Sequence, residues 1–384
     1  MISKVLLIAS LAVCATGVPA AIAQVHTAPP RPDVSQLLQA AEKARDENRD
    51  EESIRLFRRA LIEQPESEEA LWYLGTMLYE KKQYAEARDA LRVFMTLRSD
   101  AGPGWSLLGM CEFNLREYPR ALDHLQRAMA QGIGDRKELE QPMLYHLEAL
   151  LTRFDRYEDS LALLAYGELD SSFVEPAGLA GLRLPFLPAE IPPDRRELVD
   201  LAGKAVLAAQ AEHNEEAESG FKQLVASYPN EPGVHFLYGA FLARQHPDEA
   251  VPEFERELEI SPFHVLARVR LAEQLTVKRD FDRALVLAQQ AIKLEPKRAS
   301  AHLFAGEALV AKGKAAEGIR ELEIARDGDP DVIRTHLDLL RAYTSAGRKQ
   351  DADREKQEIA KLLDHDAPSR PSASGDIPHH QAAP

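Results

Sequence analysis

Small residues recur through this sequence every 33 or 34 positions, and this period restricts the possible folds more than any other feature. The first series is Gly75, Gly109, Gly239, Ala272 and Gly306. A second series is Ser53, Ala87, Ala121, Ala217, Ala250, Ala284, Gly318 and Ala352. Prolines recur with the same spacing at Pro229, Pro262, Pro296 and Pro330. A period of this length is typical of a solenoid built from one repeated supersecondary unit.

Residues 68–100 show what one unit contains. Apolar side chains fall at helical spacing on both sides of a polar break at residues 80–83. They are Leu71, Leu74 and Leu78 before the break and Ala87, Leu91 and Phe94 after it. This pattern predicts a helical hairpin, in which Gly75 and Ala87 are small because the two helices cross there.

These features resemble the tetratricopeptide repeat family. The resemblance is carried by Trp105-x-x-Leu108-Gly109, Tyr118-x-x-Ala121 and Leu125-x-x-Ala128, and again by Phe281-x-x-Ala284, Ala291 and Pro296. It implies an all-α solenoid, a right-handed superhelix of about nine hairpins, and it is typical of exported bacterial-type members. The units are placed at residues 34–67, 68–101, 102–135, 141–174, 198–231, 232–264, 265–298, 299–332 and 333–366. Ala41, Ser160, Gly167 and Lys356 depart from the family pattern.

Residues 1–23 have the composition of a secretory signal peptide. Lys4 precedes a short apolar run, and Ala21-Ile22-Ala23 is a small-x-small cleavage pattern that would leave Gln24 first. A membrane anchor would need a longer run than this one, which Gly17 and Pro19 interrupt. Lipidation at Cys14 is the other alternative, although Val13 is a poor fit before a lipidated cysteine. We therefore expect an exported protein, periplasmic or secreted.

The mature chain is expected to contain two repeat arrays. A linker at 24–33 leads to an amino-terminal array at 34–174, and a proline-rich joint at 175–197 leads to a carboxyl-terminal array at 198–366. The joint is interpreted as structural, with a loop lying in the binding groove as the alternative. Residues 367–384 are expected to be a disordered tail, in which His379-His380 makes an incomplete metal site.

Composition and motifs argue against several classes of function. Aspartate and glutamate number 62 against 47 lysines and arginines, a formal charge of −15 that disfavours nucleic acid as a partner. The sequence contains no phosphate-binding glycine loop, HExxH, CxxC or Gly-x-Ser-x-Gly motif. We accordingly expect no catalytic residues, no cofactor and no metal.

The resemblance implies that the first helix of each unit lines a concave surface that binds a protein or peptide. The residues expected to bind the partner lie on the first helices of units two to four. They are Trp72, Thr76, Tyr79, Ser106, Met110, Phe113, Asn114, Tyr145, Thr152 and Arg153. The alternative is that half of them only pack against a neighbouring helix. Apart from Phe236, the equivalent carboxyl-terminal positions lack large aromatic residues, so the amino-terminal groove is preferred.

The predicted function is a non-catalytic interaction scaffold or adaptor of the cell envelope. An accessory or docking module of an envelope enzyme or secretion complex is the alternative, and self-association within a larger envelope assembly is a third hypothesis. Leu38 and Glu42 occupy places where the carboxylate-clamp subtype of the family carries its binding groups, so that subtype is not expected. The oligomeric state stays open.

Overall fold

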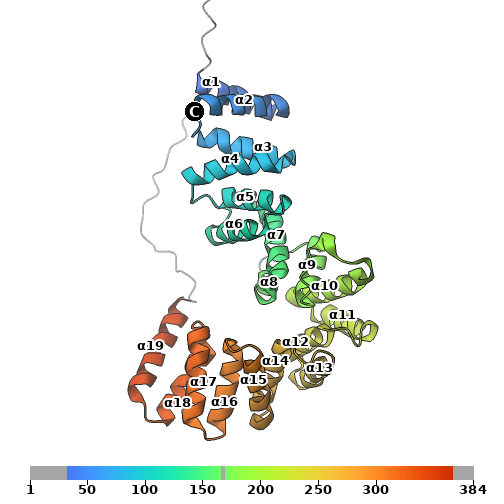
Figure 1. The fold of residues 1–384 in the computed structure, drawn as a ribbon, viewed down its shortest axis with the longest axis vertical. Coiled ribbons are helices and arrows are strands. Elements are labelled where there is room, and N and C mark those ends of the chain that lie inside the picture. Colours follow the sequence, from blue (N-terminus) through green and yellow to red (C-terminus); the bar gives the residue numbers. More distant parts are fainter. Residues whose placement is uncertain (1–32, 166–168, 366–384) are drawn as a thin grey trace, which may run out of the picture. The chain divides into compact units, whose positions relative to one another are not determined.

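The computed structural model describes residues 33–165 and 169–365, and every regular element in these ranges is a helix (Figure 1). The predicted all-α repeat solenoid is thereby confirmed for this part of the chain. The signal segment with Cys14, nearly all of the linker, residues 166–168, and the tail with His379-His380 lie outside the described residues. Our expectations for those segments stay predictions.

The described residues divide between Leu97 and Arg98 into two compact units, and each is described by itself. The first unit contains α1 (Val34–Asp46), α2 (Asp50–Glu63), α3 (Glu68–Glu80) and α4 (Tyr84–Leu97). The second begins with α5 (Gly102–Asn114), α6 (Tyr118–Gln131), η1 (Lys137–Leu139), α7 (Glu140–Arg153) and α8 (Tyr157–Leu163). After the joint it continues with α10 (Arg196–Gln210), α11 (Asn214–Ser227), α12 (Val234–Gln245), α13 (Pro247–Ile260), α14 (Val265–Val277), α15 (Phe281–Leu294), α16 (Ala299–Ala311), α17 (Ala315–Gly328), α18 (Ile333–Ser345) and α19 (Lys349–His365).

The small residues of the sequence pattern lie where the two helices of a hairpin cross. A Cβ atom added to Gly75 would lie 2.7 Å from Leu91 Cγ, and one added to Gly109 would lie 2.7 Å from Leu125 Cγ. Ala87 and Ala121 on the second helices are fully buried. The glycines are therefore required by close packing of the helices, as the sequence pattern predicts.

The turns inside the hairpins share one backbone feature. A residue two places beyond the end of the first helix adopts a positive φ, at Asn48 (58°), Lys82 (59°), Arg116 (62°), Asp155 (58°), Glu212 (59°), Arg279 (65°), Gly313 (78°) and Gly347 (73°). This left-handed conformation reverses the chain and lets its N–H groups bond the last carbonyls of the helix. These eight hairpins thus have the same tight turn whether or not glycine occupies it, whereas α12 and α13 are joined by His246 alone, whose φ is negative.

Residues 171–195, which begin just before the predicted proline-rich joint at 175–197, contain ordered helical segments within the second unit. They are η2 (Ser171–Phe173), α9 (Val174–Gly181), η3 (Pro188–Glu190) and η4 (Pro193–Arg195). Helix α9 crosses α10 so closely that a Cβ on Gly178 would lie 2.1 Å from Val199 O, and one on Gly203 would lie 1.8 Å from Val174 O. Helix α9 is therefore packed tightly against α10, and the structural interpretation of the joint stays a prediction.

Candidate functional site

Three first helices carry the residues that the sequence assigns to partner binding. Helix α3 carries three of them in the first unit, and α5 and α7 carry seven in the second. Seven of the ten side chains are partly or fully exposed. They are Trp72, Thr76, Tyr79, Phe113, Asn114, Tyr145 and Arg153.

In the first unit, the aromatic side chains Trp72 and Tyr79 of α3 pack against the second helix of the same hairpin, α4. The rings of Trp72 and Phe94 have their centroids 5.4 Å apart, and those of Tyr79 and Tyr84 are 5.7 Å apart. Thr76 Oγ1 donates a hydrogen bond to Trp72 O at 2.9 Å. The side chains of Trp72 and Tyr79 are both half-buried.

A polar cluster that the sequence analysis missed lies beside these residues in the first unit. The guanidinium carbon of Arg45 lies 4.2 Å from the ring centroid of Tyr73, and Tyr73 stacks on Phe57 at 5.7 Å. Burial raises the pKa of the Glu69 carboxyl, and the neighbouring Glu42 carboxylate raises it further. The sequence feature that could have indicated this cluster is the aromatic residue Tyr73, which directly follows Trp72 on the same helix.

In the second unit, a continuous series of ring contacts joins α5, α7 and η2. Phe113 contacts His146 with centroids 4.4 Å apart, Tyr145 lies 5.5 Å from His146, and Phe173 lies 5.9 Å from Tyr145. We call Phe113, Tyr145, His146 and Phe173 the aromatic cluster. Phe113 and Tyr145 were predicted as site residues, whereas His146 and Phe173 were not.

His146 is a neutral member of the aromatic cluster. Burial lowers its pKa, although the hydrogen bond to the Pro142 carbonyl opposes that shift. Its Nδ1 atom lies 2.6 Å from Pro142 O, and because a carbonyl oxygen only accepts, Nδ1 carries the proton. The ring therefore extends the apolar face of α7 and adds no charge at neutral pH.

Three of the predicted site residues are fully buried and unavailable to a partner at this surface. Ser106, Met110 and Thr152 have no exposed area. Thr152 Oγ1 donates to Glu148 Oε1 at 3.4 Å and shares a hydrogen bond with Ser160 Oγ at 2.9 Å. For these three residues, the alternative that they pack against neighbouring helices describes the structure.

The buried Glu148 carboxyl stands at the crossing of α7 and α8, where other hairpins have a small residue. Burial raises its pKa to about 8, although hydrogen bonds from Ser160 and Thr152 oppose the shift. Ser160 Oγ donates to Oε1 at 2.7 Å, while Oε2 has no hydrogen-bond partner among the residues that the structure describes. Glu148 is thus a neutral acid that fills the crossing.

Two further predicted residues make local contacts. Arg153 Nη1 donates to Pro185 O at 2.8 Å and lies 3.5 Å from the Glu190 carboxylate, so this arginine holds the joint against α7. Asn114 is exposed, and its Nδ2 donates to Met110 O at 2.8 Å. Arg153 therefore has a positioning role that its place on the first helix did not reveal.

The first helices of the carboxyl-terminal repeats present paired charges where α3, α5 and α7 present aromatic rings. Arg334 donates to the two Glu307 carboxylate oxygens at 2.7 and 2.9 Å and to Glu273 at 3.4 Å. Burial raises the pKa of Glu307, and the adjacent Asp338 raises it further. Phe236 and Phe304 are only 7% and 5% exposed, so neither offers a free ring.

Within residues 33–165 and 169–365, no three side chains of the metal-binding types gather closely enough to hold an ion. Among the described helices, none combines the length and the apolar character that a bilayer crossing requires.

Comparison with known proteins found matches to a family model in both halves of the chain. A family model described as tetratricopeptide repeat matches residues 38–104 and 270–333. No curated protein matches the sequence. The matched residues lie mostly in the first unit and in the carboxyl-terminal part of the second.

Solved structures of MamA are among the similar folds. The MamA RS-1 ArsTM double mutant has 21% identity and a TM-score of 0.41, and the match covers 45% of this chain and 97% of that one. MamA 41-end from Desulfovibrio magneticus RS-1 has 22% identity and a TM-score of 0.38, covering 44% and 94% of the two chains. A further crystal structure of MamA has 17% identity and a TM-score of 0.38, covering 42% and 96%.

Proposed function

We propose that this array of tetratricopeptide repeats is a non-catalytic scaffold of the cell envelope that binds a polypeptide partner. The repeats matched in two regions support a protein–protein interaction role. The partner would lie along the first helices of the amino-terminal repeats, in the concave surface that the repeat type implies.

The aromatic cluster is the observation that carries this proposal. Phe113 and Tyr145 are half-buried, so they are held in place on one side and open on the other. Rings held in this way lose little conformational entropy on binding, which is why aromatic residues dominate binding hot spots. At the equivalent carboxyl-terminal surface, charged side chains are already paired with each other, as Arg334 is with Glu307. They therefore contribute less binding free energy to a partner.

The test replaces Tyr79 and Phe113 together with alanine. Proximity labelling in the native cell followed by mass spectrometry identifies the partner, whose affinity is then measured with the purified proteins. We expect the double variant to lose about 2–4 kcal/mol of binding free energy, or roughly 30- to 1000-fold in affinity.

The matched control is Phe263→Ala, which removes an aromatic ring that is 79% exposed outside the proposed surface. It should leave the affinity unchanged. Melting curves of both variants are needed because Tyr79 contacts Tyr84 and Phe113 contacts Tyr118. A folded double variant that binds the same partner with undiminished affinity would refute the proposed surface.

The same labelling separates the two other hypotheses. A labelled set dominated by one enzyme or by secretion components would favour an accessory or docking module. A set dominated by this protein itself would favour self-association.

The envelope location rests on the signal-like segment at residues 1–23. We expect the mature protein to begin at Gln24, with Cys14 removed, and to carry no lipid. N-terminal sequencing of the exported form measures this directly. A mature chain that starts at a lipid-modified Cys14 would contradict the prediction.

A further inference from the structure

A groove lies between the second helices of two consecutive hairpins, α13 and α15. Its volume is about 540 Å³, which is within the usual range for binding pockets. Its floor is apolar and consists of Leu258 on α13, Leu271 on α14, and Val286 and Leu287 on α15. Glu255 on α13 pairs with Arg283 on α15, so an ion pair joins the two helices at the rim. Val286 is 53% exposed and therefore presents apolar surface to a molecule that enters the groove.

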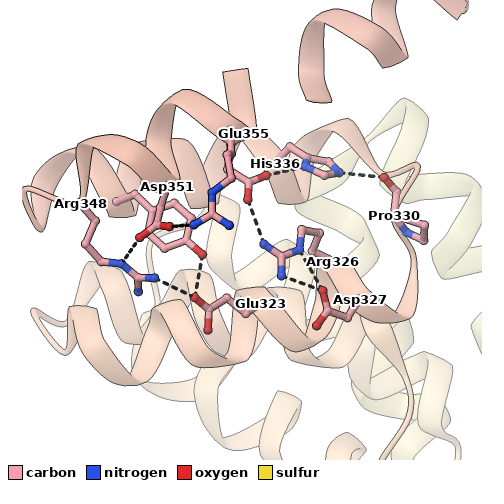
Figure 2. A network of polar contacts seen from close by, with 10 residues as sticks. Glu323, Arg326, Asp327, Pro330, His336, Arg348, Asp351 and Glu355 are labelled. Atoms are coloured by element: carbon pink, nitrogen blue, oxygen red, sulfur yellow. Dashed lines mark hydrogen bonds and ion pairs between the residues drawn. The ribbon is translucent and has the colours of Figure 1, made fainter. Parts of the chain in front are cut away.

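The equivalent groove two repeats further along the chain contains charged side chains in place of this apolar floor. The residues 68 positions later are Arg326 for Leu258, Arg354 for Val286 and Glu355 for Leu287. Arg326 Nη1 donates to Glu355 Oε1 at 3.0 Å, and Figure 2 shows these two side chains facing each other. Arg354 pairs with Asp351 on its own helix. The last groove is thus occupied by the chain's own ion pairs, whereas the groove between α13 and α15 is apolar.

The apolar residue Leu287 goes together with a second difference on the first helix of its hairpin. At the place of Leu287, helices α13, α17 and α19 carry a glutamate whose carboxylate lies 2.6 Å from a histidine on the first helix. These pairs are His235 with Glu253, His302 with Glu321, and His336 with Glu355. In the hairpin of α14 and α15, Arg268 takes the place of the histidine, and its Nε donates to Gln290 Oε1 at 3.2 Å. Because the polar partner of the first helix is Gln290, the place of the glutamate can hold a leucine that lines the groove.

The rim of the groove is acidic. Helices α13 and α15 together carry seven acidic and three basic side chains. Glu259 and Asp282 at the rim are 67% and 84% exposed, and they pair with Arg256 at 2.6 Å and with Lys312. Ion pairs as exposed as these contribute little free energy, so a lysine or arginine of a partner can replace the internal cation. The rim therefore favours a partner with positive charge beside an apolar side chain.

We propose that the groove between α13 and α15 binds a basic amphipathic segment of a partner polypeptide. An apolar side chain of the segment lies on Val286 and Leu287, and its lysines or arginines lie beside Glu259 and Asp282. A second copy of this chain, with a formal charge of −15, is a poorer match to this rim. The groove lies between second helices, whereas the aromatic cluster involves the first helices α5 and α7. One array can therefore hold two polypeptides at the same time.

The probe is a synthetic peptide of about four helical turns made of leucine and lysine, with the leucines on one face of the helix. A second peptide has the same composition in scrambled order, and a third has glutamate in place of lysine. Fluorescence anisotropy with the whole protein measures the three dissociation constants. We expect the amphipathic basic peptide to bind at least about tenfold more tightly than either of the others.

The main variant is Val286→Arg with Leu287→Glu, which introduces the residue pair that α17 has at residues 320–321 and α19 at residues 354–355. The two changes leave the net charge of the groove unaltered, so only the apolar floor is lost. We expect the affinity for the basic peptide to fall at least about tenfold. Val286→Ser, at a residue that is half exposed, is the second variant and should lower the affinity by about threefold or more without disturbing the fold.

The matched control is Ile324→Ser, because Ile324 is 46% exposed on α17 outside the groove. It should bind the basic peptide with the affinity of the natural protein. Glu259→Gln with Asp282→Asn removes two carboxylates of the rim. This variant should bind about threefold or more weakly at about 50 mM salt, and the difference should shrink at about 500 mM salt because the charges are then screened.

Three results would overturn the proposal. The first is a folded Val286→Ser variant that binds the basic peptide as tightly as the natural protein does. The second is equal binding of the scrambled or the acidic peptide. The third is self-association of the natural protein in sedimentation experiments that Val286→Arg with Leu287→Glu abolishes, because a second copy would then cover the groove.

The double variant Tyr79→Ala with Phe113→Ala separates this proposal from the proposed function. It should bind the basic peptide with undiminished affinity, because neither residue lines the groove. Loss of peptide binding in this variant, with binding retained by the groove variants, would overturn the groove proposal and leave the first-helix surface standing.

Discussion

Replacing Gly203 by alanine should destabilise the protein by at least about 3 kcal/mol, at the upper end of the usual cost of overpacking. The added Cβ would lie 1.8 Å from Val174 O, a backbone atom that cannot move unless α9 moves with it. Alanine is normally more favourable than glycine in a helix by about 1 kcal/mol, so helix propensity alone would predict a gain in stability instead of the expected loss. Urea unfolding measures the effect.

The control is Lys204→Ala at the next residue of α10. Its side chain is 62% exposed and forms an ion pair with Asp200 on the same helix, so a change within about 0.5 kcal/mol is expected. If Gly203→Ala unfolds at the same urea concentration as the natural protein, α9 does not cross α10 at this glycine.

Replacing Glu148 by glutamine should make the protein more stable at pH 8 by several kcal/mol while changing its stability little at pH 4. Burial raises the pKa of Glu148 from 4.5 to about 8. Between those two values the folded chain keeps a proton that the unfolded chain releases. Each pH unit in that window lowers the stability of the natural protein by up to about 1.4 kcal/mol, and the loss is complete above pH 8.

Glutamine has the size of the neutral acid and can accept the same hydrogen bonds from Ser160 and Thr152, but it does not titrate. The difference in unfolding free energy between variant and natural protein should therefore grow as the pH rises from 4.5 to 8. Glu216→Gln, at a carboxylate that is 76% exposed, serves as the control and should show no such growth. A pH-independent difference at residue 148 would mean that Glu148 is ionised in the folded protein.

The helical hairpins could be predicted because the small residues that recur along the sequence are also the residues at which the helices cross. Gly75 and Gly109 recur with the repeat, and both meet a leucine at the crossing. The joint could not be predicted in this way, since the contact between Gly178 and α10 does not recur with the repeat in the part of the chain that the structure describes. Nothing in its local sequence identifies the partner helix.

Two of the four residues of the aromatic cluster, Phe113 and Tyr145, could be predicted because they lie at repeated positions of the first helices. The repeat assigns residues to the first helix, but the exposure of each depends on neighbours that do not repeat. Thr152 is buried and hydrogen-bonded to Ser160 and to Glu148, a residue that occupies the crossing where other hairpins have glycine or alanine. His146 joins the aromatic cluster through its contact with Phe113, which lies on another helix.

In several repeats a side chain near the start of the first helix donates a hydrogen bond to a backbone carbonyl six residues earlier, in the loop before that helix, and we call this contact the loop tie. The loop tie has a consequence for how an array of this kind can change its length. Each tie satisfies a carbonyl of the preceding loop with a long donor that the incoming hairpin brings with it. A hairpin duplicated or deleted as a whole would carry its donor along, so the new neighbours would join without a stranded carbonyl. Tryptophan, histidine and arginine all fill this role at Trp105, His302 and Arg268, which shows that the junction tolerates donors of different shape. Gain or loss of whole units by recombination is thus compatible with the junction chemistry, whereas a break inside a unit would separate a donor from its helix.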